Sequence, residues 1–217
     1  MGITAGWETT AKVSGTATAM TAEAMSGSGA GPYQVTNTAK RVLDPDDTFT
    51  FYDNGVAILA ADISSVDYLQ GKVTFTGSKT GPITVTGDYL PMLSWASCRN
   101  VSLSIVADKL DTSVFGSQWK TSIQGMKEIS GSAEILERLT YDLDSGGGTR
   151  TWDAVFTNGT QVVLEISPGA TSTHRFFAIL VDMSSDAPAS DLVVDGFGFA
   201  SVAKKAADNT IVTPVTF

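Results

Sequence analysis

Apolar and polar residues alternate with a period of two over several stretches of the chain. Residues 82–87 read Pro-Ile-Thr-Val-Thr-Gly, and residues 101–105 read Val-Ser-Leu-Ser-Ile. Successive side chains of a strand point to opposite faces, so this pattern is typical of strands with one buried face. The alternation therefore predicts a β-rich fold.

Two hairpins are predicted early in the patterned region, over residues 48–59 and 66–76. In the first, Asn54-Gly55 separates two apolar runs, and Asn-Gly in that position is the strongest short hairpin signal. In the second, Gln70-Gly71 separates two further strand-like runs.

The second half of the chain predicts longer strands, with Ser130-Gly131 as a break between two of them. These strands are expected over residues 119–129, 132–141, 161–167, 175–183 and 192–202.

One short helix is predicted over about residues 150–158. Trp152, Val155 and Phe156 recur at helical spacing and form one apolar stripe. Thr149 or Thr151 supplies the N-cap, and Asn158-Gly159 ends the helix.

The two ends of the chain lack this patterning. Residues 1–31 are rich in Ala, Thr, Gly and Ser, which predicts an N-terminal arm that is flexible or ordered by a partner. Residues 203–217 are expected to form a C-terminal tail, and residues 32–202 a single β-rich domain. The expected fold class is all-β, a β-sandwich or barrel with one short flanking α-helix.

Composition and charge exclude some classes of function. Apolar residues make up 42% of the 217 residues, enough for a core, but charged residues make up only 17%. Thr, Ser, Gly and Ala fill the difference, and they suit strands, turns and surfaces that neighbours cover. Acidic residues outnumber basic ones by 23 to 14, so the chain lacks the basic stripe of a nucleic-acid-binding protein. An acidic surface repels DNA and lets it pass without binding.

Catalytic and metal-binding chemistry is poorly represented. His174 is the only histidine and Cys98 the only cysteine, so neither a catalytic triad nor an ordinary zinc site is apparent. We therefore expect no enzymatic activity and no cofactor. The sequence begins without a secretory signal pattern, and no apolar run is long enough to act as a membrane anchor.

Residues 101–137 carry the most distinctive order of features. A strand leads into a loop that mixes acidic and apolar residues, followed by Trp119-Lys120-Thr121-Ser122-Ile123-Gln124-Gly125 and then Ser130-Gly131-Ser132-Ala133-Glu134. This order, continued by the predicted helix and the strands after it, resembles the major tail tube proteins of long-tailed, siphovirus-like bacteriophages. The resemblance covers the second half of the chain well and residues 32–87 only loosely.

The resemblance implies a structural virion protein. Subunits of this family form hexameric rings, and the rings stack into a hollow phage tail tube through which DNA passes into the host. The implied partners are further copies of the chain and other tail proteins at the tube ends, with no specific binding of the passing DNA. The implied location is the virion, in the phage tail, after assembly in the host cytoplasm.

Residues 108–120 correspond to the family's long loop that joins one ring to the next. Apolar side chains within a charged loop favour a contact with another subunit over the alternative, a mobile surface loop. The candidate ring-stacking residues are Asp108, Lys109, Leu110, Asp111, Val114, Phe115 and Trp119.

Polar positions on the flanking strands are candidates to face the tube lumen. The alternative is that they are ordinary solvent-facing residues, which alternation cannot distinguish. These candidates are Ser102, Ser104, Ser122, Gln124 and Glu128.

The chain departs from the family in residues 32–87, which are longer than the simplest tube subunits need. They are expected to decorate the tube exterior or to enlarge the contact between subunits. Two other functions remain open: a tail terminator or head–tail connector ring, and a carbohydrate-binding β-sandwich. The second requires aromatic residues gathered on one face, whereas the four tryptophans are dispersed along the sequence.

Overall fold

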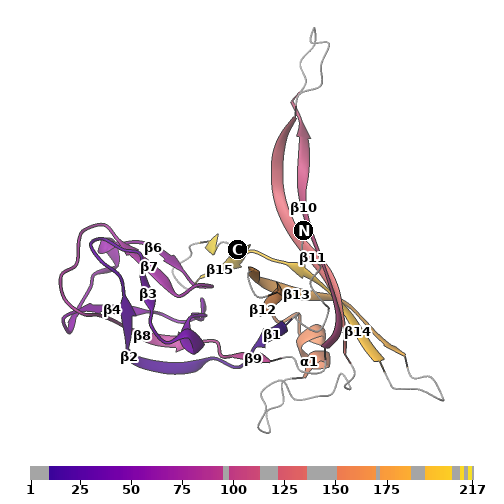
Figure 1. Ribbon diagram of the computed structural model, residues 1–217, viewed down its shortest axis with the longest axis horizontal. Coiled ribbons are helices and arrows are strands. Elements are labelled where there is room, and N and C mark those ends of the chain that lie inside the picture. Colours follow the sequence, from indigo (N-terminus) through magenta and orange to yellow (C-terminus); the bar gives the residue numbers. More distant parts are fainter. Residues whose placement is uncertain are drawn as a thin grey trace.

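The computed structural model of the protein describes residues 10–94, 98–112, 122–135, 151–169, 172–186, 194–206, 211–212 and 215–216. Within these residues nearly every element is a β-strand, and the strands pair antiparallel in two large sheets (Figure 1). The described part of the chain contains one short α-helix, α1, at Trp152–Thr157. The prediction of an all-β fold with one short helix is therefore confirmed.

One sheet has eight strands in the order β10-β11-β14-β13-β12-β1-β9, with β17 paired to the start of β13. Two of its strands, β10 and β11, have 14 residues each and form a hairpin that projects from the rest of the sheet (Figure 1). The strands are β1 (Thr10–Ser14), β9 (Met92–Ser94), β10 (Cys98–Asp111), β11 (Ser122–Ile135), β12 (Val162–Gly169), β13 (Ser172–Asp186), β14 (Val194–Ser201) and β17 (Val215–Thr216).

The other sheet has seven strands in the order β5-β4-β8-β2-β3-β7-β6 and curls into a half-barrel. Its edge strands β5 and β6 are consecutive in the chain and are joined through a 3-10 helix at Ala60–Asp62. A second 3-10 helix spans Thr38–Lys40. The strands are β2 (Thr18–Ser26), β3 (Tyr33–Val35), β4 (Thr50–Asp53), β5 (Val56–Ala57), β6 (Ile63–Asp67), β7 (Lys72–Phe75) and β8 (Ile83–Tyr89); a separate small pair is formed by β15 (Lys204–Lys205) and β16 (Ile211–Val212).

The turn between β4 and β5 follows the Asn-Gly signal. Asp53 pairs with Val56, so Asn54 and Gly55 alone make the turn, with φ of 50° and 79°. Two successive positive φ values are the geometry that matches the right-handed twist of a hairpin, and Asn and Gly tolerate them best.

A bent pair of strands joins the two sheets. β1 pairs with β9 in the eight-stranded sheet, and β2, which follows β1, pairs with β8 in the seven-stranded sheet. At the corner between them, the Gly15 N–H donates to the Pro91 carbonyl over 2.7 Å. The whole seven-stranded sheet therefore lies, in sequence, between the neighbouring strands β1 and β9.

Helix α1 covers part of the core of the eight-stranded sheet. The Thr151 hydroxyl accepts a hydrogen bond from the Ala154 N–H at 3.2 Å, which caps the helix as the sequence predicts. Trp152 is buried and stacks on Phe197 of β14 with ring centroids 4.5 Å apart. Of the predicted apolar stripe, Trp152 and Val155 are buried in this core, whereas Phe156 remains 39% exposed.

The half-barrel encloses a second core that also includes residues of the eight-stranded sheet. Val163 on β12 and Phe177 on β13 are each buried among side chains of the half-barrel. The two sheets therefore share buried surface and do not form independent cores.

A carboxylate near this junction holds two cations. Glu165 on β12 receives Lys12 Nζ at 2.7 Å on one oxygen and Arg175 Nε at 2.9 Å on the other. Arg175 also donates through Nη1 to the carbonyl of Leu69, which belongs to the half-barrel. Burial raises the pKa of Glu165, but the hydrogen bonds and charges of Lys12 and Arg175 outweigh it and hold the pKa below its usual range.

Three expectations from the sequence require correction. Residues 10–26, assigned above to an arm, form β1 and β2, because Val13 and Met20 reach the cores and both strands have partners on each side. In the expected C-terminal tail, Val215–Thr216 adds to the eight-stranded sheet as β17.

The third correction concerns Ser130-Gly131, which is not a break. β11 runs through it without interruption, and a Cβ on Gly131 would lie 2.1 Å from the Ser102 carbonyl oxygen and 2.7 Å from the Phe199 ring. Glycine is needed here for the close approach of strand and ring, not for a turn.

Candidate assembly surface

The hairpin formed by β10 and β11 projects from the body of the eight-stranded sheet. Each strand has 14 residues, and their pairing runs from Cys98↔Ile135 to Asp111↔Ser122. The next strand, β14, pairs with β11 only over residues 130–135. Residues 105–111 and 122–129 thus form a two-stranded ribbon, called here the ribbon, which extends beyond the sheet (Figure 1).

The base of the hairpin has one covered and one open face. Ile129 and Ala133 are buried, and Val101 and Leu103 pack against the same core. We call this side the core face.

The opposite side, called the open face, carries small polar and acidic residues. Ser102 and Ser132 lie opposite each other with their hydroxyl oxygens 2.8 Å apart, and Ser104 and Glu128 are exposed on the same side. Across β14 and the second half of β13 the open face continues with Gly196, Gly198, Asp182 and Ser184.

Close contacts fix this part of the open face. The Gly198 N–H donates to Asp182 Oδ1 at 2.6 Å, and a Cβ on Gly198 would lie 2.8 Å from that carboxylate. The glycine therefore lets the acidic side chain lie close against the strand.

The described charged groups of the open face are acidic, and Val106 and Ile123 are exposed on the same face. Along β10, β11, β14 and the second half of β13, the described side chains on this face include no lysine or arginine. Its carboxylates belong to Asp108, Glu128, Glu134 and Asp182.

A β-bulge changes the facing of residues within the ribbon. Ala107 pairs with Lys127 but Lys109 pairs with Gln124, so β11 has one more residue than β10 between these pairs. β10 is regular across this point, so Lys109 stays on the same side as Ala107, which is the core face. Gln124 and Ser122, which face Lys109 and Asp111, are therefore on the core face of the ribbon.

The predicted lumen-facing residues thus separate into two groups. Ser102, Ser104 and Glu128 share the open face, whereas Ser122 and Gln124 lie on the opposite side of the ribbon. The grouping from the sequence assumed an unbroken alternation along β11. Gly125, which lies at the bulge, is the signal that sequence reasoning missed, because glycine inside a strand often marks a bulge.

The predicted ring-stacking residues divide between the strand and the segment after it. Asp108, Lys109, Leu110 and Asp111 belong to β10, which continues farther than expected. Val114, Phe115 and Trp119 lie outside the described residues.

Strand β10 is one edge of the eight-stranded sheet. Its outer side has no partner among the described strands, and the opposite edge is the three-residue strand β9. Large apolar side chains are exposed on the ribbon: Ile105 is 46%, Val106 is 55% and Ile123 is 57% exposed. A long edge with exposed apolar residues is a site where another chain can add.

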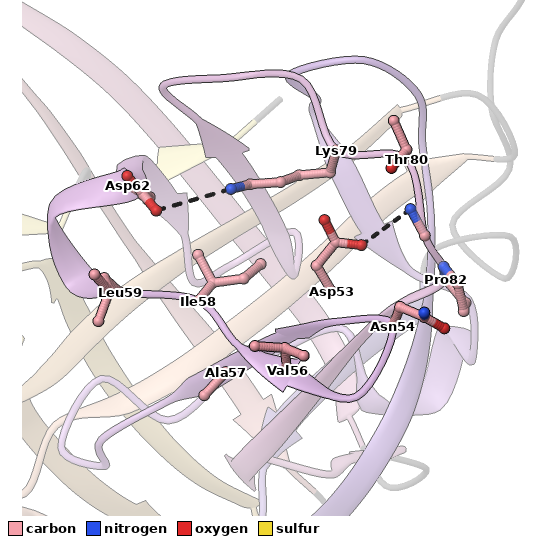
Figure 2. A pocket seen from close by; sticks show the side chains of 11 residues that line it. Asp53, Asn54, Val56, Ala57, Ile58, Leu59, Asp62, Lys79, Thr80 and Pro82 are labelled. Carbon is pink, nitrogen blue, oxygen red and sulfur yellow. Dashed lines mark hydrogen bonds and ion pairs between the residues drawn. The ribbon is translucent and has the colours of Figure 1, made fainter.

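A cavity of about 660 Å³ lies at the half-barrel, between the β4–β5 hairpin and the segment before β8 (Figure 2). Lys79 Nζ reaches Asp62 Oδ2 at 3.9 Å across the cavity, and Asp53 Oδ1 accepts the Gly81 N–H at 2.9 Å. The cavity lining contains no imidazole or thiol.

Other catalytic or metal-binding arrangements were sought in the described ranges. No group of three or more His, Cys, Asp or Glu side chains there is placed to hold a metal ion. His174 lies half-buried on β13 opposite Ile166. None of the described helices has the length and hydrophobicity of a membrane span.

Comparison with known proteins gave structural matches only. No family model matches the chain. No curated protein matches it either. Similar solved structures include the tail of an empty gene transfer agent particle with C6 symmetry. It has 14% identity and a TM-score of 0.45, and the match covers 58% of this chain and 86% of the other. Another is the virion of a native gene transfer agent particle, at 14% identity and a TM-score of 0.44, covering 58% and 89%. Both values are too low to establish a family or a function.

Proposed function

We propose that the chain is a structural virion protein whose copies form hexameric rings that stack into a hollow phage tail tube. The observation that carries this proposal is the projecting β10–β11 hairpin, which combines an unpaired edge, exposed apolar residues and an acidic, serine-rich face.

Ring closure follows from the edge strand. β10 offers 14 residues of backbone on its outer side without a described partner. An edge of this length is a hazard for aggregation unless something covers it, and closing sheets into a barrel removes edges altogether. Copies that continue the eight-stranded sheet from one subunit to the next would protect β10 in this way.

Contact between rings follows from the ribbon. A two-stranded hairpin standing alone is at best marginally stable in water. Ile105, Val106 and Ile123 remain about half exposed on it, which offers apolar area for a partner to bury. A neighbouring ring at the end of the hairpin would supply that partner.

The lining of the tube follows from the open face. Its described side chains are mostly serines, small residues and carboxylates such as Glu128 and Asp182, and on the ribbon they include the exposed Val106 and Ile123. Carboxylates repel phosphates, and a protein that grips DNA would instead need lysine or arginine to release counterions. A lumen lined by this face would let DNA pass without specific binding.

The half-barrel covers the open side of the eight-stranded sheet over β12 and β13, at Val163 and Phe177, and not over the β10–β11 hairpin. In this proposal it therefore lies beside the face that lines the lumen. It would decorate the tube or widen the contact between neighbouring subunits. The remaining partners are other tail proteins at the ends of the tube, and assembly takes place in the host cytoplasm.

Electron microscopy of the concentrated, purified chain tests the proposal. We expect rings or tubes about 100 Å wide, on the order of a β-domain on either side of a DNA-sized pore. Particles that remain monomeric at high concentration contradict it. Single rings that never stack would instead identify a terminator or connector protein.

The variant Phe115→Asp tests the role of the segment between β10 and β11. A buried charge at an apolar contact is costly, so we expect rings that no longer stack while the circular dichroism spectrum is unchanged. The matched control is Val56→Asp on β5, where an exposed valine also becomes an aspartate, and this variant should stack normally. Tubes of normal length from Phe115→Asp would show that this segment does not take part in the contact between rings.

A further inference from the structure

We propose that the core face of the ribbon, defined by Ile105, Lys109 and Lys127, docks on an acidic surface of a second copy of this chain in the adjacent ring. This inference rests on the proposed function and specifies which side of the ribbon makes the contact between rings. It makes the contact electrostatic as well as apolar.

Strand register places these three residues on one side. Ile105, Ala107 and Lys109 are alternate residues of β10, and Lys127 is the cross-strand partner of Ala107. Alternate residues of a strand and directly paired residues share a face. The bulge in β11 lies beyond Lys127, so it does not affect this assignment.

Both lysines are exposed and have no counter-ion among the described residues. Lys109 and Lys127 are exposed, and no ion pair within 4.0 Å joins either ammonium group to a described carboxylate. Ile105 lies between them and the body of the sheet with 46% of its surface exposed. An apolar residue flanked by two unpaired cations is typical of a contact with an acidic partner.

The opposite side of the ribbon has the reverse charge. Asp108 is the neighbour of Lys109 on β10 and Glu128 the neighbour of Lys127 on β11, and both acidic residues belong to the open face. The described charged residues on the open side of the ribbon are therefore acidic, whereas the core face carries two lysines and, at its far end, the carboxylate of Asp111. Only the core face offers positive charge to an acidic protein surface.

A second copy of the chain is the partner that fits this charge. The chain has a net charge of −9 and a pI near 4.4, so the surface that one copy offers to another is acidic overall. If the open face lines the lumen, the core face of the ribbon necessarily points away from it, toward the wall of the next ring. Charge and geometry both indicate that the core face of the ribbon contacts the next ring.

Charge reversal on the ribbon tests the inference. The variants are Lys127→Glu and Lys109→Glu, and the matched control is Lys205→Glu, which changes the net charge equally at an exposed lysine on β15. Assembly is measured by pelleting across a range of protein concentrations at low and high salt. The circular dichroism spectrum and thermal midpoint of dilute protein establish that each variant is folded.

We expect each ribbon variant to raise the concentration needed for stacking about tenfold or more, since an attraction becomes a repulsion in every subunit of the ring. Lys205→Glu should assemble like the wild type. High salt should weaken wild-type stacking and narrow the difference from the variants, because exposed charges are screened. Lys127→Gln should lie between the wild type and Lys127→Glu.

Three results overturn the inference. Ribbon variants that stack at the wild-type concentration show that this side does not make the contact. Equal stacking defects in the ribbon variants and in Lys205→Glu would show that the change in net charge, and not the position of the lysine, causes the defect. Wild-type protein that stays monomeric under all conditions contradicts the proposed function itself, and this inference fails with it.

Discussion

At the scale of single residues, Glu165 shows how a buried charge is kept. Its side chain is 7% exposed, and Lys12 and Arg175 occupy both of its oxygens. An uncompensated charge in such a place is strongly destabilising, whereas a fully hydrogen-bonded one is tolerated. Because Arg175 also reaches the Leu69 carbonyl, the ion pair fixes a side chain that bridges the two sheets.

Replacing Glu165 by glutamine should reveal this interaction and its dependence on pH. We expect Glu165→Gln to lower the free energy of unfolding by about 2–3 kcal/mol at neutral pH, since two cations lose their shared partner. The folded pKa of Glu165 is depressed from 4.5, so its stabilisation is present above pH 4.5 and is lost as the pH falls through the lower folded pKa.

Urea unfolding of both proteins across that pH range measures the effect. The difference between wild type and variant should be constant above about pH 5 and should shrink below pH 4.5. Glu134→Gln is the control, because Glu134 is exposed and makes no ion pair with a described residue. A difference that does not change with pH would mean that Glu165 acts through packing rather than charge.

At the scale of elements, the hairpin β10–β11 depends on a glycine at the point where it leaves the body. The strands β10 and β14 approach β11 so closely at Gly131 that no side chain fits between the Ser102 carbonyl and the Phe199 ring. The approach is needed because Phe199 fills the core beneath the hairpin. This glycine is therefore a packing requirement of the projecting element.

Gly131→Ala should accordingly destabilise the chain. A Cβ at 2.1 Å from a backbone oxygen forces the strands apart, and overpacking of this kind typically costs about 1–3 kcal/mol. The control is Gly77→Ala, where an added Cβ would meet nothing within 4 Å. Urea midpoints compare the two variants, and equal midpoints would show that β10 can move aside at no cost.

Strands with clear alternation could be predicted from the sequence, and elements defined by their partners could not. The β4–β5 turn at Asn54-Gly55 and the cap of α1 at Thr151 depend on local chemistry, so the sequence alone identifies them. β1 and β2 could not be predicted because Ala, Thr and Ser make up most of them, and only pairing with distant strands orders such residues.

The candidate site was predictable in position but not in facing. The sequence locates the hairpin and most of its polar residues. It does not reveal the bulge between Lys127 and Gln124, which transfers Gln124 and Ser122 to the other side. A one-residue change of register moves every later side chain of the strand to the other face of the sheet. The face on which a residue lies therefore depends on strand pairing and not on sequence pattern alone.

At the scale of the whole molecule, the two sheets are joined by shared strands and shared buried residues. The bent pair formed by β1–β2 and β8–β9 passes through both sheets, and Phe177 of the eight-stranded sheet is buried in the core of the half-barrel. Neither sheet can open without exposing apolar surface of the other.

Unfolding should therefore be a single cooperative transition. Residues 18–89, which include the half-barrel strands, contain no tryptophan but four tyrosines, Tyr33, Tyr52, Tyr68 and Tyr89. Trp152 is buried against Phe197 of the eight-stranded sheet and reports on that sheet. Urea curves from tryptophan fluorescence and from tyrosine absorbance of dilute protein should coincide. Two separate midpoints would show that the half-barrel unfolds by itself.

The corner at Gly15 and Pro91 also makes the half-barrel a replaceable insertion in the eight-stranded sheet. Ser14 and Met92 are direct cross-strand partners, so the inserted segment leaves and re-enters the eight-stranded sheet about 5 Å apart. A tight turn spans that gap, and so does any folded insert whose two ends lie side by side. Excision uncovers Val163 and Phe177, which would then need polar replacements. A foreign protein inserted between Ser14 and Met92 would then be displayed on every subunit of an assembly.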